Sequence, residues 1–220
     1  GEVERVLNNL EMSREEKHTS PSSVSRGSSL EREEDGLISL SGGKITDYRK
    51  MAEGAFNLIQ KLLKEEHNQE FTGIDSKHYP ISGGDFDPTK VKETVEKLAE
   101  VGKEKGLSEE DATYIADFYG TNAKIIFDAI DKIEPFKGLS LAESIRLWYA
   151  LEEEMTLTPA DYIVRRTNHL LFQRETLDDI LPGVVNGMAQ YYDWSAEETE
   201  KQKQALQAVI DESDLKKLKK

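Results

Sequence analysis

Residues 37–50 read LISLSGGKITDYRK, in which an apolar run meets a Gly-Gly turn and opens directly into an amphipathic helix pattern. Ile38 and Leu40 alternate with serines, which predicts a short strand. From Asp47 the apolar spacing becomes helical, and the pattern ends near Glu66. We therefore expect a strand, a turn and a helix in this order. The apolar stripe of the expected helix comprises Met51, Ala55, Leu58, Ile59 and Leu62.

The turn has the features of a ligand site. Gly42 and Gly43 carry no Cβ, so their backbone can adopt positive φ and approach a bound group closely. Lys44 adds a positive charge beside the unpaired amides of a helix N-terminus, and this combination suits a phosphate or the edge of a flavin ring. A Walker A phosphate loop is excluded, because Ile38 stands where its first glycine belongs and Ile45 where its Ser or Thr belongs.

Composition narrows the class of protein. The 220 residues include 43 acidic and 29 basic side chains, and the formal charge of −14 argues against a general nucleic-acid or anionic-membrane surface. The absence of cysteine excludes disulfides and thiolate chemistry and is compatible with a cytoplasmic protein. No apolar stretch approaches the ~20 residues that a membrane span needs. The first residue is Gly rather than Met, which fits a fragment of a longer chain.

The remaining sequence predicts a mainly α protein whose C-terminal part is a multi-helix bundle. Pro182 and Gly183 interrupt one helical pattern, so we expect a kinked or split helix there. Another apolar stripe joins Ile163, Leu170 and Leu171. One helix start is predicted where Asp87 precedes Pro88 at the first helical position. The others are predicted where a side-chain acceptor precedes an acidic residue in the first turn: Ser108 with Asp111, Ser140 with Glu143, Thr158 with Asp161, Thr176 with Asp179, and Ser195 with Glu198.

Four parts are expected along the chain. The first is acidic and Ser-rich, helical over residues 1–12 and irregular over 13–25, where apolar residues are scarce. The turn-rich third part serves as a linker. The parts are residues 1–35, the strand-turn-helix piece 36–67, the linker 68–87 and the helical domain 88–220.

Further motifs extend from this segment over nearly the whole chain. Residues 25–32 read SRGSSLER, residues 79–84 YPISGG, residues 156–161 TLTPAD, and residues 165–169 RRTNH. With these motifs the chain resembles the FAD-dependent glycerol-3-phosphate oxidases and dehydrogenases, and is most similar to the α-glycerophosphate oxidases of lactic-type bacteria. The family opens with a Gly-x-Gly-x-x-Gly dinucleotide fold that these 220 residues lack. The resemblance therefore implies the C-terminal part of a flavoprotein, with the strand-turn-helix piece as a remnant of its FAD- and substrate-binding domain.

The resemblance implies a role for the Gly-Gly turn. In the family the matching segment lies under the pyrimidine edge of the flavin, where an ammonium and helix-start amides stabilise the negative charge that a hydride brings. Lys44 is then the catalytic candidate, and Thr46 either offers its hydroxyl or only caps the helix. The implied cofactor-binding residues are Gly42, Gly43, Lys44, Ile45 and Thr46.

The resemblance also implies a phosphate site. Arg26 matches the family arginine that binds the substrate phosphate, and a guanidinium fork suits a phosphate dianion. Arg32 and Arg49 are weaker candidates that alternatively pair with local acids such as Glu31, Glu33, Glu34 or Asp47.

Other polar residues favour structural interpretations. The four histidines have no companion at metal-ligand spacing, so no metal site is predicted. Residues 152–154 are three glutamates that we interpret as a solvated helix face. Residues 191–194 are rich in aromatic side chains, which we interpret as packing in the core or at a domain interface. Arg165 and Arg166 match a family motif, and at least one is expected to pair with an acid of the bundle.

Two functions of different classes follow. The intact protein would oxidise sn-glycerol 3-phosphate to dihydroxyacetone phosphate on FAD, with oxygen as acceptor and hydrogen peroxide as product. Its expected partners are glycerol 3-phosphate, oxygen, the N-terminal FAD-binding domain of the same chain and a second copy of itself. Alternatively, the helical domain is an interaction or oligomerisation module of a quinone-linked glycerol-3-phosphate dehydrogenase. In either case the piece alone is expected to be inactive, because the part that holds FAD is missing.

Overall fold

The structure is a computed structural model that describes residues 28–214. The chain divides into two compact units between Tyr79 and Pro80, inside the turn-rich segment 68–87. The helix expected over residues 1–12, the irregular stretch 13–25 and Arg26 lie outside the described residues. None of the described helices is both long and apolar enough to cross a membrane.

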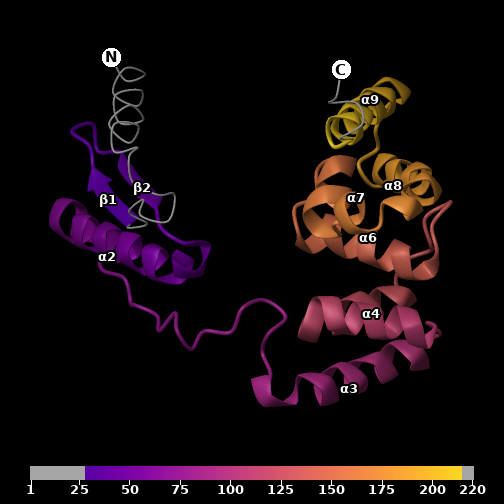
Figure 1. Ribbon diagram of the computed structural model, residues 1–220, viewed down its shortest axis with the longest axis horizontal. Helices are drawn as coiled ribbons and strands as arrows, with labels where there is room; N and C mark the ends of the chain where they lie inside the picture. The colour runs from indigo at the N-terminus through magenta and orange to yellow at the C-terminus, as the bar shows by residue number, and fades with distance from the viewer. Residues whose placement is uncertain (1–27, 215–220) are drawn as a thin grey trace, which may run out of the picture. The chain divides into compact units, whose positions relative to one another are not determined.

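The first unit contains a two-stranded antiparallel hairpin (Figure 1). Strand β1 (Ser28–Arg32) pairs with β2 (Ile38–Gly42) in a register that places Leu30 opposite Leu40. The expected strand is therefore present. Strand β1 was not expected in this Ser-rich stretch, and it supplies the partner that β2 requires. The connection turns at Gly36, whose φ is +88°.

A helix follows the hairpin in the same unit. The short 3-10 turn η1 (Ile45–Asp47) leads into α2 (Tyr48–His67), which confirms the predicted helix. An ion pair between Arg32 and Glu66 joins β1 to the last turn of α2. The helix ends at Asn68, which adopts a left-handed conformation that closes the last turn.

The second unit is helical, which confirms the mainly α prediction (Figure 1). Its α-helices are α3 (Val91–Glu104), α4 (Glu109–Tyr119), α5 (Ala123–Asp128), α6 (Leu141–Glu153), α7 (His169–Phe172), α8 (Leu177–Tyr191) and α9 (Ala196–Glu212). Its shorter turns are the 3-10 segments η2 (Pro88–Lys90), η3 (Gly120–Asn122), η4 (Ala129–Asp131) and η6 (Arg174–Thr176), and the π-helical segment η5 (Asp161–Arg166).

Serine and aspartate caps start several of these helices as predicted. The hydroxyls of Ser108, Ser140 and Ser195 accept hydrogen bonds from the third amide of α4, α6 and α9 respectively. Asp87 accepts from the Thr89 amide at 2.9 Å at the start of η2. The Thr158 hydroxyl likewise accepts from the amide of a residue three positions later, at 3.2 Å. Each bond satisfies an amide that has no partner within its helix.

Two predictions about α8 are wrong. Thr176 does not cap the helix, because its hydroxyl donates to the Gln173 carbonyl at 2.8 Å instead. The split helix expected at Pro182 and Gly183 is also wrong, because α8 continues from Leu177 to Tyr191; a kink at Pro182 stays a prediction. The bond that proline cannot make is offset by the burial of the following turns of the helix, where Val184 and Met188 lie in the core.

The stripe of Ile163, Leu170 and Leu171 does not form one helix either. The chain adopts the π-helical η5 and then breaks at Asn168, whose φ is +58°, before α7 begins. Ile163 and Leu170 are buried, whereas Leu171 is exposed. After the break Leu170 still packs in the core, whereas Leu171 lies away from it.

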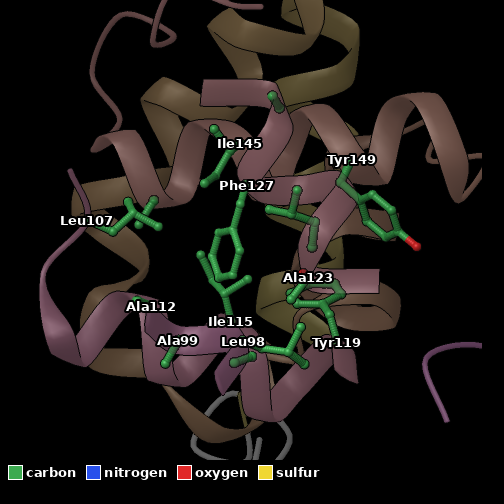
Figure 2. Close-up of a cluster of buried hydrophobic side chains, with 14 residues drawn as sticks. Leu98, Ala99, Leu107, Ala112, Ile115, Tyr119, Ala123, Phe127, Ile145 and Tyr149 are labelled. Atoms are coloured by element: carbon green, nitrogen blue, oxygen red, sulfur yellow. The ribbon is translucent and has the colours of Figure 1, made fainter. Parts of the chain in front are cut away.

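Two hydrophobic clusters form the core of the helical unit, and α6 contributes to both. Ile145 lies in the cluster built with α3, α4 and α5, and Leu147 lies in the cluster built with η5, α8 and α9. Figure 2 shows Phe127 pointing into the middle of the first cluster. A Cβ on Gly102 would lie 2.7 Å from the Phe127 ring, so this cluster leaves no room for a larger residue on α3.

Candidate functional site

The predicted flavin-binding turn lines a pocket of about 450 Å³ in the first unit. The turn after β2 forms one side of the pocket, and the first turns of α2 form the other. The apolar walls come from both elements. The lining residues are Leu40, Gly42, Gly43, Lys44, Ile45, Tyr48, Met51 and Ala52.

Both glycines of the turn have the backbone conformation that the sequence predicts. Gly42 has φ of +82° and Gly43 has φ of +87°, a region that L side chains rarely adopt. The amides of Gly43 and Lys44 donate to no backbone acceptor among residues 28–214. Within the described part of the chain, the turn thus presents two amides without a backbone acceptor beside the pocket, and an anionic or electron-rich group could accept hydrogen bonds from them.

Lys44 is the basic residue among those that line the pocket. It is extended, with φ of −84° and ψ of 148°, and its side chain is exposed. Among the described residues it forms no ion pair, whereas Arg49 on α2 pairs with Glu53 at 3.1 Å and donates to the Ser76 hydroxyl at 2.9 Å. The Lys44 ammonium is thus available to a ligand, and Arg49 is engaged within the unit.

The other two predicted flavin-binding residues, Ile45 and Thr46, lie in different surroundings. Ile45 is 90% exposed at the pocket rim. Thr46 lies inside η1 and caps no helix, because the N-cap positions of η1 and α2 are Lys44 and Asp47. The alternative role of Thr46 as a cap is therefore wrong.

The structure shows the partners of two of the three arginines that were candidates for the phosphate site. Arg26 lies outside the described residues. Arg32 pairs with Glu66 and Arg49 with Glu53, so both form structural ion pairs. The expected partners were wrong, because both carboxylates come from α2 rather than from the acidic residues next to each arginine in the sequence.

Large apolar side chains remain exposed on the first unit. Ile45 is 90%, Tyr48 66% and Leu37 61% exposed, and α2 contains no fully buried residue. An apolar surface of this kind marks a contact with further protein or with a ligand. This exposure fits a piece of a larger domain.

The helical unit contains a buried polar cluster that the sequence did not reveal. Glu143 in the first turn of α6 accepts hydrogen bonds from Tyr162 Oη at 2.6 Å and from Arg146 Nη1 at 3.0 Å. His169 Nε2 faces the same carboxylate at 3.1 Å. The Tyr119 hydroxyl accepts from Arg146 Nε at 3.4 Å. The cluster links α4, α6, η5 and α7.

The charges of this cluster compensate one another. Burial alone would raise the pKa of Glu143, but the hydrogen bond from His169 and the charge of Arg146 outweigh it and lower the pKa to about 2. The Arg146 guanidinium also lies 4.8 Å from the centre of the Tyr114 ring, a cation–π distance. The hydrogen bonds of Glu143 and Arg146 connect residues of α4, α6, η5 and α7, whereas Arg146 Nη2 and His169 Nδ1 are buried without a partner among the described residues.

One signal for this cluster was present in the sequence. Ser140 and Glu143 form a capping pattern in which the glutamate is expected to turn back toward the helix start. The Glu143 side chain instead points into the core, although its amide donates to Ser140 Oγ at 3.1 Å as expected. An arginine one turn later, Arg146, is the feature that could have indicated a buried ion pair.

The paired arginines of residues 165–169 have separate structural partners. Arg165 pairs with Asp161 at 2.7 Å, which confirms that at least one of them binds an acid of the bundle. Arg166 donates from Nε and Nη2 to the Glu154 carbonyl at 2.9 and 2.6 Å. Glu154 was expected on a solvated face, but it is half-buried, and burial raises the pKa of its carboxyl.

Comparisons with known proteins agree with this architecture. The α-glycerophosphate oxidase of Lactococcus lactis subsp. lactis is 60% identical over 219 residues, which are 100% of this chain and 36% of that protein. The α-glycerophosphate oxidase of Streptococcus pneumoniae serotype 4 is 45% identical over 99% of this chain and 36% of its own. The chain thus spans about a third of the length of these relatives.

A solved structure shares the fold. The X-ray structure of the glycerol-3-phosphate dehydrogenase from Bacillus halodurans, complexed with FAD, matches with a TM-score of 0.74 and 26% identity over 83% of this chain and 37% of that chain. The sequence model described as the C-terminal domain of alpha-glycerophosphate oxidase matches residues 74–199. With more than half of its residues matched by that model, the chain belongs to the α-glycerophosphate oxidase family.

Proposed function

We propose that this chain is the C-terminal part of a flavoprotein that oxidises sn-glycerol 3-phosphate to dihydroxyacetone phosphate and passes the electrons to oxygen, which forms hydrogen peroxide. The observation that carries the proposal is the pocket at the Gly42–Gly43 turn, in a chain that belongs to this family. A cytoplasmic location and the N-terminal domain of the same protein as partner belong to the same proposal.

The residues at the turn fit one edge of a flavin. The amides of Gly43 and Lys44, which have no backbone acceptor among residues 28–214, would donate to its polar edge. The pocket wall from Leu40 and Tyr48 would cover the apolar part of the ring. When bound, FAD supplies a two-electron acceptor for the hydride from substrate C2. Lys44 would hold a positive charge beside the bound ring, which would stabilise developing negative charge and lower the barrier to that transfer.

Arg26 is proposed to bind the phosphate of the substrate. A guanidinium donates two parallel hydrogen bonds to a phosphate dianion, which fixes the orientation of the small substrate. In the full-length protein, Arg26→Ala should therefore raise the KM for glycerol 3-phosphate more than it lowers kcat. Arg49→Ala, which removes an arginine engaged with Glu53, is the matched control.

The electron acceptor is tested with the full-length protein. Flavin absorbance is followed after addition of glycerol 3-phosphate without oxygen, and oxygen is then admitted and peroxide assayed. Bleaching followed by fast recolouring with stoichiometric peroxide supports the oxidase. Slow recovery with little peroxide would instead support a dehydrogenase with a quinone acceptor, and failure to bleach would contradict glycerol 3-phosphate as the substrate.

A second function is proposed for the helical part, residues 88–220, as a packing and self-association module. Phe172 and Leu171 at the end of α7 are 78% and 60% exposed, which favours a contact with further protein. This function is compatible with the first, because it concerns a different surface. The purified 220-residue chain should be colourless, and a yellow preparation would show that the isolated piece holds flavin.

A further inference from the structure

The segment that follows α6 holds a methionine in an unfavourable backbone conformation. Met155 has φ of +51°, in the left-handed region that glycine and asparagine fill at lower cost, and its side chain is 80% exposed. A flexible, apolar thioether usually packs in a core. We propose that Met155 is a surface site of methionine oxidation by hydrogen peroxide, an inference that rests on the proposed function for the source of the peroxide.

The backbone on both sides of Met155 is held by side chains of other elements. The preceding carbonyl, of Glu154, accepts from Arg166 Nε and Nη2 at 2.9 and 2.6 Å. The following carbonyl, of Thr156, accepts from Tyr192 Oη at 2.7 Å, and the Thr156 amide donates to the Ala150 carbonyl at 3.2 Å. Fixed neighbours therefore keep the thioether in solvent.

Hydrogen bonds also hold the backbone of the two residues after Thr156. The Thr158 amide donates to Asp161 Oδ2 at 2.9 Å, and the Leu157 amide donates to the same oxygen at 3.2 Å. The side chain of Thr156 is fully buried beneath this corner. Because the chain is held before and after Met155, its backbone keeps the conformation in which the side chain is exposed.

The other described methionines provide an internal comparison. Met188 on α8 is fully buried in the core of the helical unit. Met51 is half-buried on α2, where it lines the pocket at the Gly-Gly turn. Among residues 28–214, Met155 is thus the methionine most accessible to a small oxidant in solution.

The chemistry needs only peroxide. The thioether sulfur attacks one peroxide oxygen, the O–O bond breaks, and the products are methionine sulfoxide and water. The sulfur loses two electrons, and the peroxide gains them. The product is polar and can be reduced back by sulfoxide reductases. Because the Met155 side chain already lies in solvent, the sulfoxide leaves the fold intact, whereas oxidation of Met188 would place a polar group in the core.

Trypsin separates Met51, Met155 and Met188, the three methionines among residues 28–214, which makes the test direct. Cleavage at the surrounding basic residues releases Met51 in peptide 51–61, Met155 in peptide 147–165 and Met188 in peptide 175–201. Because the two larger peptides each contain a tryptophan, fragmentation must place the added oxygen on the methionine. The full-length flavoprotein is treated either with reagent peroxide or with glycerol 3-phosphate in air, with and without catalase.

We expect Met155 to gain oxygen at least about tenfold faster than Met188 under reagent peroxide, because susceptibility follows exposure. Turnover in air should give the same adduct, and catalase should suppress it. Equal rates at Met155 and Met188 under reagent peroxide would overturn the proposal. An adduct with reagent peroxide but none during turnover would support the oxidation site and contradict oxygen as the electron acceptor.

Met155→Leu separates the site from general damage. The variant keeps an apolar side chain of similar size in the same exposed position. Adducts at Met51 and Met188 should form at unchanged rates in this variant, and the rate of flavin bleaching by substrate should also be unchanged. An increase at Met188 after the substitution would contradict the proposal that Met155 is oxidised in solvent without consequence for the core.

Discussion

Arg146 Nη1 lies 3.0 Å from Glu143 Oε2, one helical turn along α6, and both side chains are almost completely buried. Two charges leave water only when they compensate each other and find further hydrogen bonds. Tyr162 and His169 supply such bonds on the carboxylate side, and Tyr119 lies beside the guanidinium. The pair lies on the helix that contributes to both hydrophobic clusters, so its loss should affect the whole helical unit.

Glu143→Gln should lower the free energy of unfolding by about 3–5 kcal/mol, because it leaves the Arg146 charge buried without its counter-charge. Urea titration followed by tryptophan fluorescence measures this, since Trp148 and Trp194 both belong to the helical unit. The control is Glu153→Gln, an exposed glutamate at the other end of α6, which should change stability by no more than about 0.5 kcal/mol. Equal effects of the two substitutions would contradict the buried pair.

The Glu143 carboxylate also makes the free energy of unfolding depend on pH. The pKa of Glu143 is about 2 in the folded chain, below its ordinary value of 4.5, so its contribution is present above pH 4.5 and is lost as the pH falls toward 2. The shift corresponds to about 3 kcal/mol. Urea titrations of the natural chain and of Glu143→Gln between pH 6 and 2.5 should therefore converge at low pH. Parallel curves would show that Glu143 is not the group responsible.

Two glycines in helices should respond to alanine in opposite directions. A Cβ on Gly183 of α8 would lie 2.5 Å from Leu139 Cδ2 and 2.8 Å from the Gly138 carbonyl oxygen. Gly183→Ala should therefore destabilise by about 1–3 kcal/mol despite the better helix propensity of alanine. At Gly54 of α2 the nearest atom, Leu30 Cδ2, is 4.0 Å away, so Gly54→Ala should stabilise by up to about 1 kcal/mol. Circular dichroism melting curves compare the two, and a gain at both positions would contradict the packing at Gly183.

The left-handed conformation of Met155 should have a measurable cost. Met155→Gly removes the conflict between Cβ and the backbone at φ of +51° and should stabilise the helical unit by about 1 kcal/mol. Met155→Ala keeps the Cβ and should bring no such gain. Tryptophan-monitored urea titration again suffices, and equal stabilities of the glycine and alanine variants would show that the backbone is relaxed at this position.

Local signals allowed most helix starts to be predicted. A serine followed three residues later by an acidic residue defines a cap by short-range hydrogen bonds alone, and Ser108, Ser140 and Ser195 behave in this way. Thr176 has the same pattern but fails, because a preceding 3-10 turn brings the Gln173 carbonyl within 2.8 Å of its hydroxyl. That competing acceptor depends on the path of the chain before the helix, which the pattern does not contain.

Long-range pairing was the part that the sequence could not specify. Strand β1 lies in a Ser-rich stretch, and only its pairing with β2 makes it a strand. The Glu143 cluster depends in the same way on His169, which is 26 residues distant in the chain. At the candidate site, the positive φ of Gly42 and Gly43 was predictable because only glycine adopts it freely. The contacts of each residue with the flavin remain a prediction.

Lys44 provides the sharpest test of the proposed flavin site. Its ammonium is exposed beside the pocket and forms no ion pair among the described residues, so its charge is available to a bound flavin. In the full-length protein, Lys44→Met should slow anaerobic flavin reduction by glycerol 3-phosphate about 10²–10³-fold, as expected when a preorganised group that stabilises developing charge is removed. The flavin midpoint potential should also become more negative, because the reduced form loses a neighbouring positive charge.

Lys50→Met is the matched control for this experiment, since Lys50 is an exposed lysine in the first turn of α2 and is not among the residues that line the pocket. It should leave the reduction rate within about twofold, because an exposed charge outside the site is screened by solvent. If Lys44→Met slows flavin reduction but leaves the midpoint potential unchanged, Lys44 contacts the substrate rather than the flavin. Equal reduction rates for the two variants would remove Lys44 from the reaction altogether, and the Gly42–Gly43 turn would then act through its backbone amides alone.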